Sequence, residues 1–191
     1  MRPLIAVFNS FLAIPVRFLC LTAVFGAAFC TPACPTDGGM PAPPEYRLRL
    51  YHTHTGERLD IVYKKDGKYI PEAVTELDHF LRDHRTGADA SYDPRIFDLL
   101  RDVTVKVGRP RAEIQIICGY RTPWSNALLR SRSKDVAEHS LHMVPEAVDI
   151  RVEGVRTAKV RDAALALRRG GVGYYFKSDF VHVDLGRVRR W

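Results

Sequence analysis

Residues 138–150 read EHSLHMVPEAVDI, and residues 180–184 read FVHVD. The first stretch ends in an apolar run that carries one carboxylate, Asp149. In the second, His182 and Asp184 alternate with apolar residues, and alternation of this kind places both side chains on one face of a strand. A carboxylate inside an apolar strand is costly unless it is paired or binds a metal ion. These two stretches therefore predict two strands that carry polar side chains into a shared site.

Three of the side chains form a candidate metal site. His142 and Asp149 lie seven residues apart, and His182 comes from the later stretch. Three nitrogen and oxygen ligands with an open fourth position are typical of catalytic zinc, so these three residues are the predicted ligands. The alternative is a buried histidine–aspartate pair held by a hydrogen bond alone. The helical zinc-protease motif HExxH is absent from the sequence.

The segments around these stretches predict a mixed fold. Period-two alternation predicts strands at residues 46–52, 59–63, 113–118, 147–152, 172–176 and 180–185. Proline caps and helical spacing predict helices that begin at Pro71, Pro94 and Pro123, and a fourth over residues 157–169 that ends at Gly170-Gly171. Strands and helices mix without a regular βαβ repeat. The predicted class is α+β, with a small, mostly antiparallel sheet flanked by helices.

Four further histidines have no partner in the sequence pattern. His52 and His54 fall at the tip of the first predicted hairpin, where we expect them to face solvent. His79 and His84 follow among charged residues of the first predicted helix. Exposed histidines are common, so none of the four is a candidate ligand.

The N-terminal residues differ in composition from the rest. Residues 18–29 form an apolar run of 12 residues, shorter than the roughly 20 that a membrane-spanning helix needs. Small residues occupy positions 26–28 near the end of this run, as at a signal cleavage site, so we interpret residues 1–30 as a signal peptide or an uncleaved N-terminal anchor. Residues 31–45 are rich in proline and glycine and read as a linker. The folded domain is expected over residues 46–191.

The net charge of +7 and the isoelectric point of about 9.4 favour an anionic partner. The basic residues are scattered and no aromatic-interleaved basic module is present, which argues against nucleic acid. The four cysteines are Cys20, Cys30, Cys34 and Cys118, and no CxxC pair suggests a cysteine zinc site. Cys118 lies in an apolar run and is interpreted as a small buried hydrophobic residue.

At this point the sequence resembles a known family. Residues 140–149, SLHMVPEAVD, resemble the SxHxxGxAxD motif of the D-Ala-D-Ala peptidase family, part of the lysostaphin and Hedgehog zinc-fold group. Residues 118–122, CGYRT, are similar to that family's SGYR segment. Residues 170–191 are similar to the C-terminus of murein endopeptidase K-like proteins. The likeness covers residues 46–191 and implies a Hedgehog/D-Ala-D-Ala peptidase-like fold for a zinc peptidase domain.

The resemblance also implies roles for particular residues. Zinc would be bound by the three predicted ligands, and substrate would be contacted by Arg121, Tyr120 and Ser140. A guanidinium can grip a carboxylate or carbonyl with two hydrogen bonds, and Ser140 would in addition support the ligand loop. The glycine of the motif is Pro145 here, so a backbone conformation with positive φ is excluded at that position.

The general base is left open between two carboxylates. The group commonly uses a histidine two residues before the third ligand or an acidic residue three before it. Phe180 occupies the first position and Asp179 the second. Asp184 is the preferred candidate because it shares a strand face with His182, whereas Asp179 follows a Lys-Ser turn.

The predicted function is zinc-dependent hydrolysis of peptide bonds in peptidoglycan by an exported, periplasmic murein endopeptidase that cuts stem-peptide cross-links. The cofactor is Zn²⁺, and the partners are peptidoglycan stem peptides, with no nucleic acid. A membrane would be contacted only through an uncleaved N-terminal segment. The alternatives are a D,D- or L,D-carboxypeptidase and a catalytically inactive zinc module that binds peptidoglycan.

Overall fold

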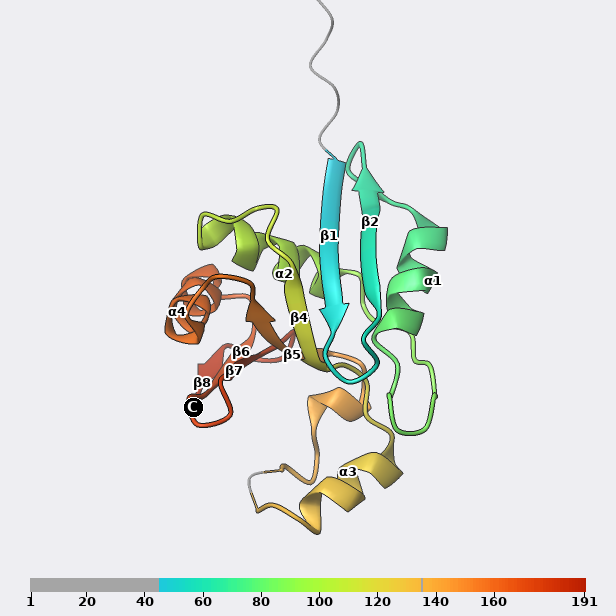
Figure 1. Cartoon of the computed structure of the whole chain (residues 1–191), viewed down its shortest axis with the longest axis vertical. Coiled ribbons are helices and arrows are strands. Elements are labelled where there is room, and N and C mark those ends of the chain that lie inside the picture. The colour runs from blue at the N-terminus through green and yellow to red at the C-terminus, as the bar shows by residue number, and fades with distance from the viewer. Residues whose placement is uncertain (1–44, 135) are drawn as a thin grey trace, which may run out of the picture. The chain divides into compact units, whose positions relative to one another are not determined.

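The computed structural model describes residues 45–134 and 136–191 (Figure 1). The predicted signal or anchor over residues 1–30 and all of the predicted linker except Glu45 lie outside the described residues. Within the described part of the chain, no helix is long and apolar enough to span a membrane.

One mixed sheet organises residues 45–134 and 136–191, with its eight strands in the order β3-β2-β1-β4-β5-β7-β6-β8. The strands are β1 (Glu45–His52), β2 (Arg58–Lys65), β3 (Lys68–Tyr69), β4 (Ile114–Cys118), β5 (Ala147–Val152), β6 (Gly171–Tyr175), β7 (Phe180–Asp184) and β8 (Arg189–Arg190). Only the β1–β4 and β6–β8 pairings are parallel among these described strands. The α+β class and the mostly antiparallel sheet are therefore confirmed. β3 and β8 were not predicted, because two residues are too few to show a period.

The helices are α1 (Pro71–Phe80), α2 (Arg95–Lys106), α3 (Pro123–Arg130) and α4 (Thr157–Leu167), with a 3₁₀ turn η1 (Leu141–Met143). α1 packs against β2, α2 against β1 and α4, and α4 against the strands of the other half of the sheet (Figure 1). Their apolar sides bury residues such as Leu77, Phe97 and Leu100 against the sheet. Each fully buried side chain of this size contributes about 1.5–3 kcal/mol. α3 lies with η1 beyond one end of the sheet (Figure 1).

The predicted end of α4 at Gly170-Gly171 was wrong. The helix ends at Leu167, because Arg168 adopts a left-handed conformation with φ of 52°. The glycines serve packing instead. A Cβ atom on Gly170 would collide with the backbone carbonyl of Asp184, and one on Gly171 would collide with the Asp184 carboxylate. The glycine pair thus lets β6 lie close to the carboxylate at the end of β7.

A buried carboxylate fixes the segment that leads into α3. Asp83 Oδ2 accepts hydrogen bonds from the amide and the hydroxyl of Thr122, at 2.9 and 2.7 Å. The Thr122 hydroxyl in turn accepts from the Ser125 amide and caps α3. Just before it, a Cβ atom on Gly119 would collide with the carbonyl of Leu81. The chain between β4 and α3 is therefore held against the loop that follows α1.

Two of the histidine predictions were wrong. His52 is fully buried rather than solvent-facing, and its Nδ1 atom accepts from the amides of His54 and Thr55 at 3.3 Å. Its ring packs edge-on against Phe80. His84 lies outside α1, which ends at Phe80, and stacks on His54 with 4.1 Å between ring centroids. His84, in the loop after α1, packs against His52, whereas His54 at the hairpin tip is exposed, as expected.

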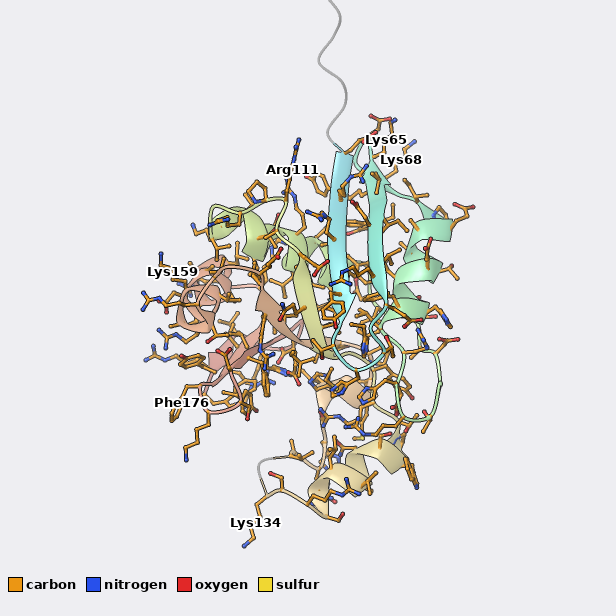
Figure 2. All side chains as sticks on the ribbon, viewed as in Figure 1. Lys65, Lys68, Arg111, Lys134, Lys159 and Phe176 are labelled. Atoms are coloured by element: carbon orange, nitrogen blue, oxygen red, sulfur yellow. The ribbon has the colours of Figure 1, made fainter. Side chains whose placement is uncertain are left out.

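The surface cations are dispersed, as the sequence predicts. Lys65 and Lys68 are paired in the β2–β3 hairpin, and the other labelled cations, Arg111, Lys134 and Lys159, lie on separate parts of the chain (Figure 2). Many arginines of the described residues are in addition paired with a neighbouring carboxylate, as in Arg47–Asp60 and Arg169–Asp102.

Candidate metal centre

The three predicted ligands converge although they come from three elements. Asp149 and His182 are direct cross-strand partners in the antiparallel β5–β7 pair, and His142 is presented by η1. Asp149 Oδ1 lies 2.9 Å from His182 Nδ1 and 3.3 Å from His142 Nε2, and the two ring nitrogens are 3.1 Å apart. All three side chains are buried. The register of β5 against β7 and the η1 turn together bring the three ligands into contact. Residue spacing in the sequence showed neither of these two features.

The donor set fits a zinc ion. Zinc–nitrogen and zinc–oxygen bonds of about 2.0–2.1 Å in tetrahedral geometry place ligand atoms about 3.3 Å apart, close to the three separations in the cluster. Two ring nitrogens and a carboxylate oxygen that face one another in a buried space need a cation or a shared proton between them. Histidine and aspartate are ordinary zinc ligands.

The outer nitrogens of both rings have partners of their own. His142 Nδ1 lies 2.8 Å from the carbonyl oxygen of Gly119, and His182 Nε2 lies 3.1 Å from Asp184 Oδ2. Both partners are acceptors, so each outer nitrogen carries a proton and donates it. The inner nitrogens are then left with lone pairs that point into the cluster. Metal-binding histidines are oriented in this way, by a carbonyl or a carboxylate behind the ring.

The local electrostatics favour a positive charge in the cluster. Burial disfavours the charged form of His142, but the Asp149 carboxylate and the Cys118 sulfur together outweigh burial and raise the pKa of His142 to about 10. Burial would raise the pKa of Asp149, yet the neighbouring histidines hold that pKa well below its usual range. Without a metal, a proton on His142 balances the carboxylate, and a divalent cation can take the same place.

Asp184 lies behind His182 and does not line the cavity described below. The side chain has no exposed surface. Its Oδ1 atom accepts from the amides of Gly171 and Gly186 at 2.8 Å, and its Oδ2 atom accepts from His182 and from Arg189 Nη2 at 3.1 and 2.8 Å. Burial raises its pKa, but these hydrogen bonds prevail and lower the pKa to about 2. The shared strand face was predicted, whereas the enclosure by backbone amides and Arg189 was not.

Asp179 lies away from the cluster, at the turn into β7. Its side chain is 66% exposed, and its Oδ1 atom accepts from the hydroxyl of Thr157 at 2.7 Å. Arg151 donates to its backbone carbonyl. Asp179 does not line the cavity either, so neither of the two candidate bases faces the space above the metal cluster.

A cavity of about 680 Å³ opens over the cluster. Its lining includes the three ligands, two predicted substrate residues, Arg121 and Ser140, and the aromatic side chains of Tyr175, Phe180 and Trp191. The third predicted substrate residue, Tyr120, packs against the core instead of lining the cavity. A second cavity of about 630 Å³, along β1 and the end of α2, contains no histidine and lies apart from the ligands.

Arg121 is held in place at the edge of the cluster. Its amide donates to the carbonyl of His142 at 3.0 Å, and Nη1 donates to Asn126 Oδ1 at the same distance. Its Nε atom is buried and has no hydrogen-bond partner within the described residues. Arg121 also lines the cavity, so a guanidinium fixed in this way is positioned to donate to a carbonyl or carboxylate of a ligand.

Ser140 supports the ligand turn, and Pro145 is compatible with it. The Ser140 hydroxyl accepts from the His142 amide at 3.3 Å and caps η1. The turn is closed by the Glu146 amide, which donates to the carbonyl of Leu141 at 3.1 Å. Pro145 is not among the described residues with positive φ, so the loop reaches β5 without the conformation that a glycine would permit.

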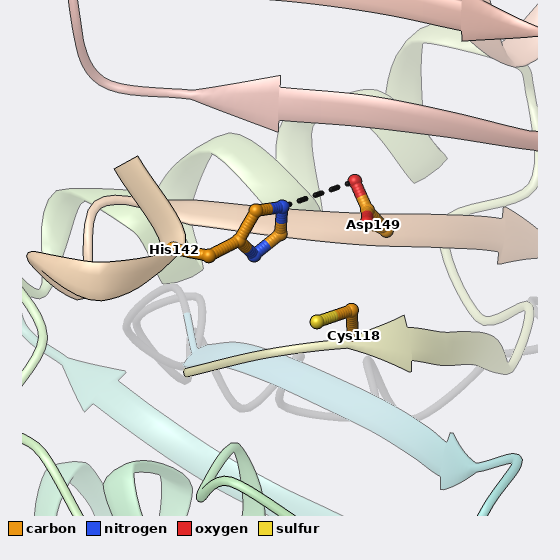
Figure 3. Close-up of side chains that lie close together, drawn as sticks. All are labelled: Cys118, His142 and Asp149. Carbon is orange, nitrogen blue, oxygen red and sulfur yellow. Dashed lines mark ion pairs between the residues drawn. The ribbon is translucent and has the colours of Figure 1, made fainter. Parts of the chain in front are cut away.

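Sequence reasoning missed three neighbours of the cluster. Cys118 lies beside two of the ligands: suitable donor atoms of Cys118, His142 and Asp149 all lie within 4.8 Å of one another (Figure 3). Arg189 supports Asp184, as described above. Trp191 packs its ring 5.2 Å from that of His182 and donates from Nε1 to the Tyr175 hydroxyl at 2.9 Å. The order GRVRRW at the C-terminus was recognised only as part of a resemblance.

Comparisons with known proteins agree with this geometry. Residues 41–191 match the model of a peptidase family described as Peptidoglycan L,D-endopeptidase MepK. The probable peptidoglycan L,D-endopeptidase MepK of Haemophilus influenzae is 39% identical over 153 residues, which cover 80% of this chain and 82% of that protein. The peptidoglycan L,D-endopeptidase MepK of Escherichia coli K12 is 40% identical over 169 residues, covering 88% and 91%. No solved structure matches the chain. The chain therefore belongs to this peptidase family, which confirms its resemblance to the murein endopeptidase K-like proteins of the D-Ala-D-Ala peptidase type.

Proposed function

We propose that this chain is a zinc-dependent endopeptidase that hydrolyses peptide cross-links in peptidoglycan, with the L,D bond preference that the names of its relatives state. The observation that carries the proposal is the buried cluster of His142, Asp149 and His182 at the base of an open cavity. Three converging donors with the cavity on one side match a catalytic rather than a closed structural site.

The chain's own residues would divide the work as follows. His142, Asp149 and His182 hold the ion, which when bound polarises a carbonyl group and makes water a better nucleophile. Arg121 lines the cavity, and its guanidinium would donate to the substrate backbone or a stem-peptide carboxylate and thereby orient the scissile bond. Ser140 keeps the His142 turn in position.

We assign Asp184 a positioning role in place of the expected proton transfer. Its carboxylate fixes the orientation and the tautomer of His182 and increases the basicity of the inner nitrogen. A buried carboxylate whose oxygens are fully engaged, with a pKa near 2, is poorly suited to accept a proton from a nucleophile in the cavity.

Proton transfer then falls to a group that reaches the cavity. His139 lines the cavity and is exposed, and imidazole is the side chain that most often transfers protons in enzyme active sites. We therefore propose His139 as a second candidate proton acceptor, in addition to Asp179. Asp179 would have to act from the turn before β7, where its carboxylate is already bonded to Thr157.

The cellular setting follows from the substrate. Peptidoglycan lies outside the cytoplasm, so the chain would be exported to the periplasm, with residues 1–30 as signal or anchor, 31–45 as linker and 46–191 as the zinc peptidase domain. N-terminal sequencing of protein from the native host tests the export proposal. An intact Met1 on cytosolic protein would contradict it.

A defined substrate tests the function directly. The purified full chain is incubated with cross-linked muropeptides of known bond type, with and without a chelator, and the products are identified by mass spectrometry. We expect cross-link cleavage that stops with chelator and returns with added zinc. Loss of only a terminal residue from uncrosslinked stems would identify a carboxypeptidase, and binding without cleavage would identify an inactive module.

A further inference from the structure

Trp191 belongs to an aromatic wall of the cavity over the metal cluster. The residue follows β8 and lines the cavity together with Tyr175 of β6 and Phe180 of β7. Tyr175 and Phe180 are cross-strand partners, and their rings stack with 4.5 Å between centroids. The indole Nε1 atom of Trp191 donates to the Tyr175 hydroxyl at 2.9 Å. The three aromatic side chains are therefore joined in one wall, which the β6–β7 pair and the residue after β8 build.

Trp191 is fixed in this wall by its backbone and by its ring. Its amide donates to the carbonyl of Val172 at 3.3 Å, and its carbonyl accepts from the amide of Tyr174 at 3.0 Å. A Cβ atom on Gly173 would collide with the indole, so the glycine lets the ring lie close to β6. The guanidinium of Arg189 lies 4.8 Å from the ring centroid. A side chain held in this way loses little conformational entropy when a ligand binds to it.

Half of this firmly held side chain is nevertheless open to solvent. Trp191 is 50% exposed, and its single polar side-chain atom is already bonded to Tyr175. The part of the indole that remains exposed is therefore carbon surface. Tryptophan with an apolar body open and its N–H group satisfied is a common anchor in binding sites. The wall is thus suited to an apolar group of a ligand.

The position of Trp191 beside the metal cluster limits which substrate group can reach it. Its ring centroid lies 5.2 Å from that of the ligand His182. In the proposed site the scissile bond lies at the ion, so the group in contact with Trp191 belongs to the residue next to that bond and not to the glycan. Stem peptides are cross-linked through side chains that contain several methylene groups, and these groups are apolar.

We propose that Trp191 is a specificity residue that binds the methylene groups of the cross-linking side chain. A long aliphatic side chain next to the scissile bond would pack on the indole, whereas a methyl group would leave this surface in contact with water. The inference rests on the proposed peptidoglycan substrate and adds a selective contact to it. The metal ligands would act on the peptide bond, and the aromatic wall would select the residue beside it.

Two synthetic stem tetrapeptides provide the test, one with norleucine and the other with alanine at the cross-linking position. The chain has two tryptophans, so Trp124→Phe leaves Trp191 as the only one and its fluorescence reports binding to the zinc-loaded full chain. We expect a saturable change in emission and at least about tenfold tighter binding of the norleucine peptide, because three more methylene groups are buried. In the matched variant Trp191→Phe, the emission of Trp124 should stay constant.

Calorimetric titrations of wild type and Trp191→Ala separate a substrate contact from mere support of His182. Trp191→Ala should bind both peptides with equal affinity and keep about one zinc ion per chain. Trp191→Phe should regain part of the preference for norleucine. Zinc loss in Trp191→Ala, an equal preference in wild type and Trp191→Ala, or no preference in wild type would overturn the inference. Wild type that shows the predicted binding but cleaves no cross-linked muropeptide would contradict the proposed hydrolysis alone.

Discussion

Two histidine clusters in this molecule have opposite chemistry. At the metal centre, the inner nitrogens of His142 and His182 lie beside the Asp149 carboxylate, and that carboxylate and Cys118 raise the pKa of His142 to about 10 against burial. In the second cluster, at the end of the β1–β2 hairpin, His84 stacks on His54 and both lie near His52.

The second cluster lacks what the first one has. Burial, with His54 next in effect, lowers the pKa of His52 to about 4, and burial, with Arg85 next, lowers that of His84 to about 4. The Nδ1 atom of His52 is already occupied by two backbone amides. Several histidines close together therefore do not make a metal site. A metal site needs ring nitrogens that converge on one point, a carboxylate beside them and a hydrogen-bond acceptor behind each ring.

The largest effect is expected from a ligand substitution. His182→Ala should reduce cross-link cleavage to the uncatalysed background, because two remaining donors hold zinc weakly and the reaction depends on the ion. Initial rates on defined muropeptides measure this loss. The matched control is His84→Ala, from the second cluster, which should cleave at close to the wild-type rate. Equal losses in both variants would remove the distinction between the clusters.

A smaller effect is expected from a substitution of Asp184, which lies behind the ligand His182. Asp184→Asn should weaken zinc affinity by about 10–100-fold, the usual result of removing a carboxylate that orients a metal-binding histidine. Asp179→Asn should leave the affinity unchanged, because its carboxylate faces Thr157. Competition with a chromophoric chelator gives both constants. Unchanged zinc affinity with a 10²–10⁴-fold lower rate in Asp184→Asn would return proton transfer to Asp184.

Stability should respond to the carboxylate that joins the loop after α1 to α3. Asp83→Asn should lower the free energy of unfolding by about 1.5–3 kcal/mol, since hydrogen bonds to a buried charge are lost. Burial opposes ionisation of Asp83, but the nearby Ser125 side chain and the hydrogen bonds from Thr122 lower its pKa to about 2. This contribution is complete above the unfolded pKa of about 3.8 and disappears as the pH falls toward 2. Urea titrations of both proteins between pH 2 and 6 measure it.

The second cluster should produce the smallest effect, a shallow acid sensitivity. Since its folded pKa is lowered, neutral His84 stabilises the fold fully above 6.5, and the contribution falls as the pH drops from 6.5 toward 4. His84→Ala should reduce the dependence of the unfolding free energy on pH over that interval. Thermal unfolding at fixed zinc concentration between pH 4 and 7 gives the slope, and an unchanged slope would assign the sensitivity to other groups.

The sequence predicted the strands of the site well and their neighbours poorly. Alternation in FVHVD was enough to place His182 and Asp184 on one strand face, and the spacing of His142 and Asp149 proposed the ligand pair. The enclosure of Asp184 depends on β8 and on close approach at Gly170-Gly171, which no local period encodes. Cys118 was interpreted as a core residue, because its position beside Asp149 depends on the β4–β5 pairing, which the sequence does not show. His52 was expected to face solvent, because no local sequence pattern shows that the loop after α1 packs against it.

The central claim is that one zinc ion is held by His142, Asp149 and His182. Its most direct test is the zinc content per chain of purified full-length protein, measured by mass spectrometry for wild type, His142→Ala, His182→Ala and His84→Ala. We predict about one zinc ion in the wild type and in His84→Ala, and little or none in the two ligand variants. Full zinc content in both ligand variants would contradict the claim.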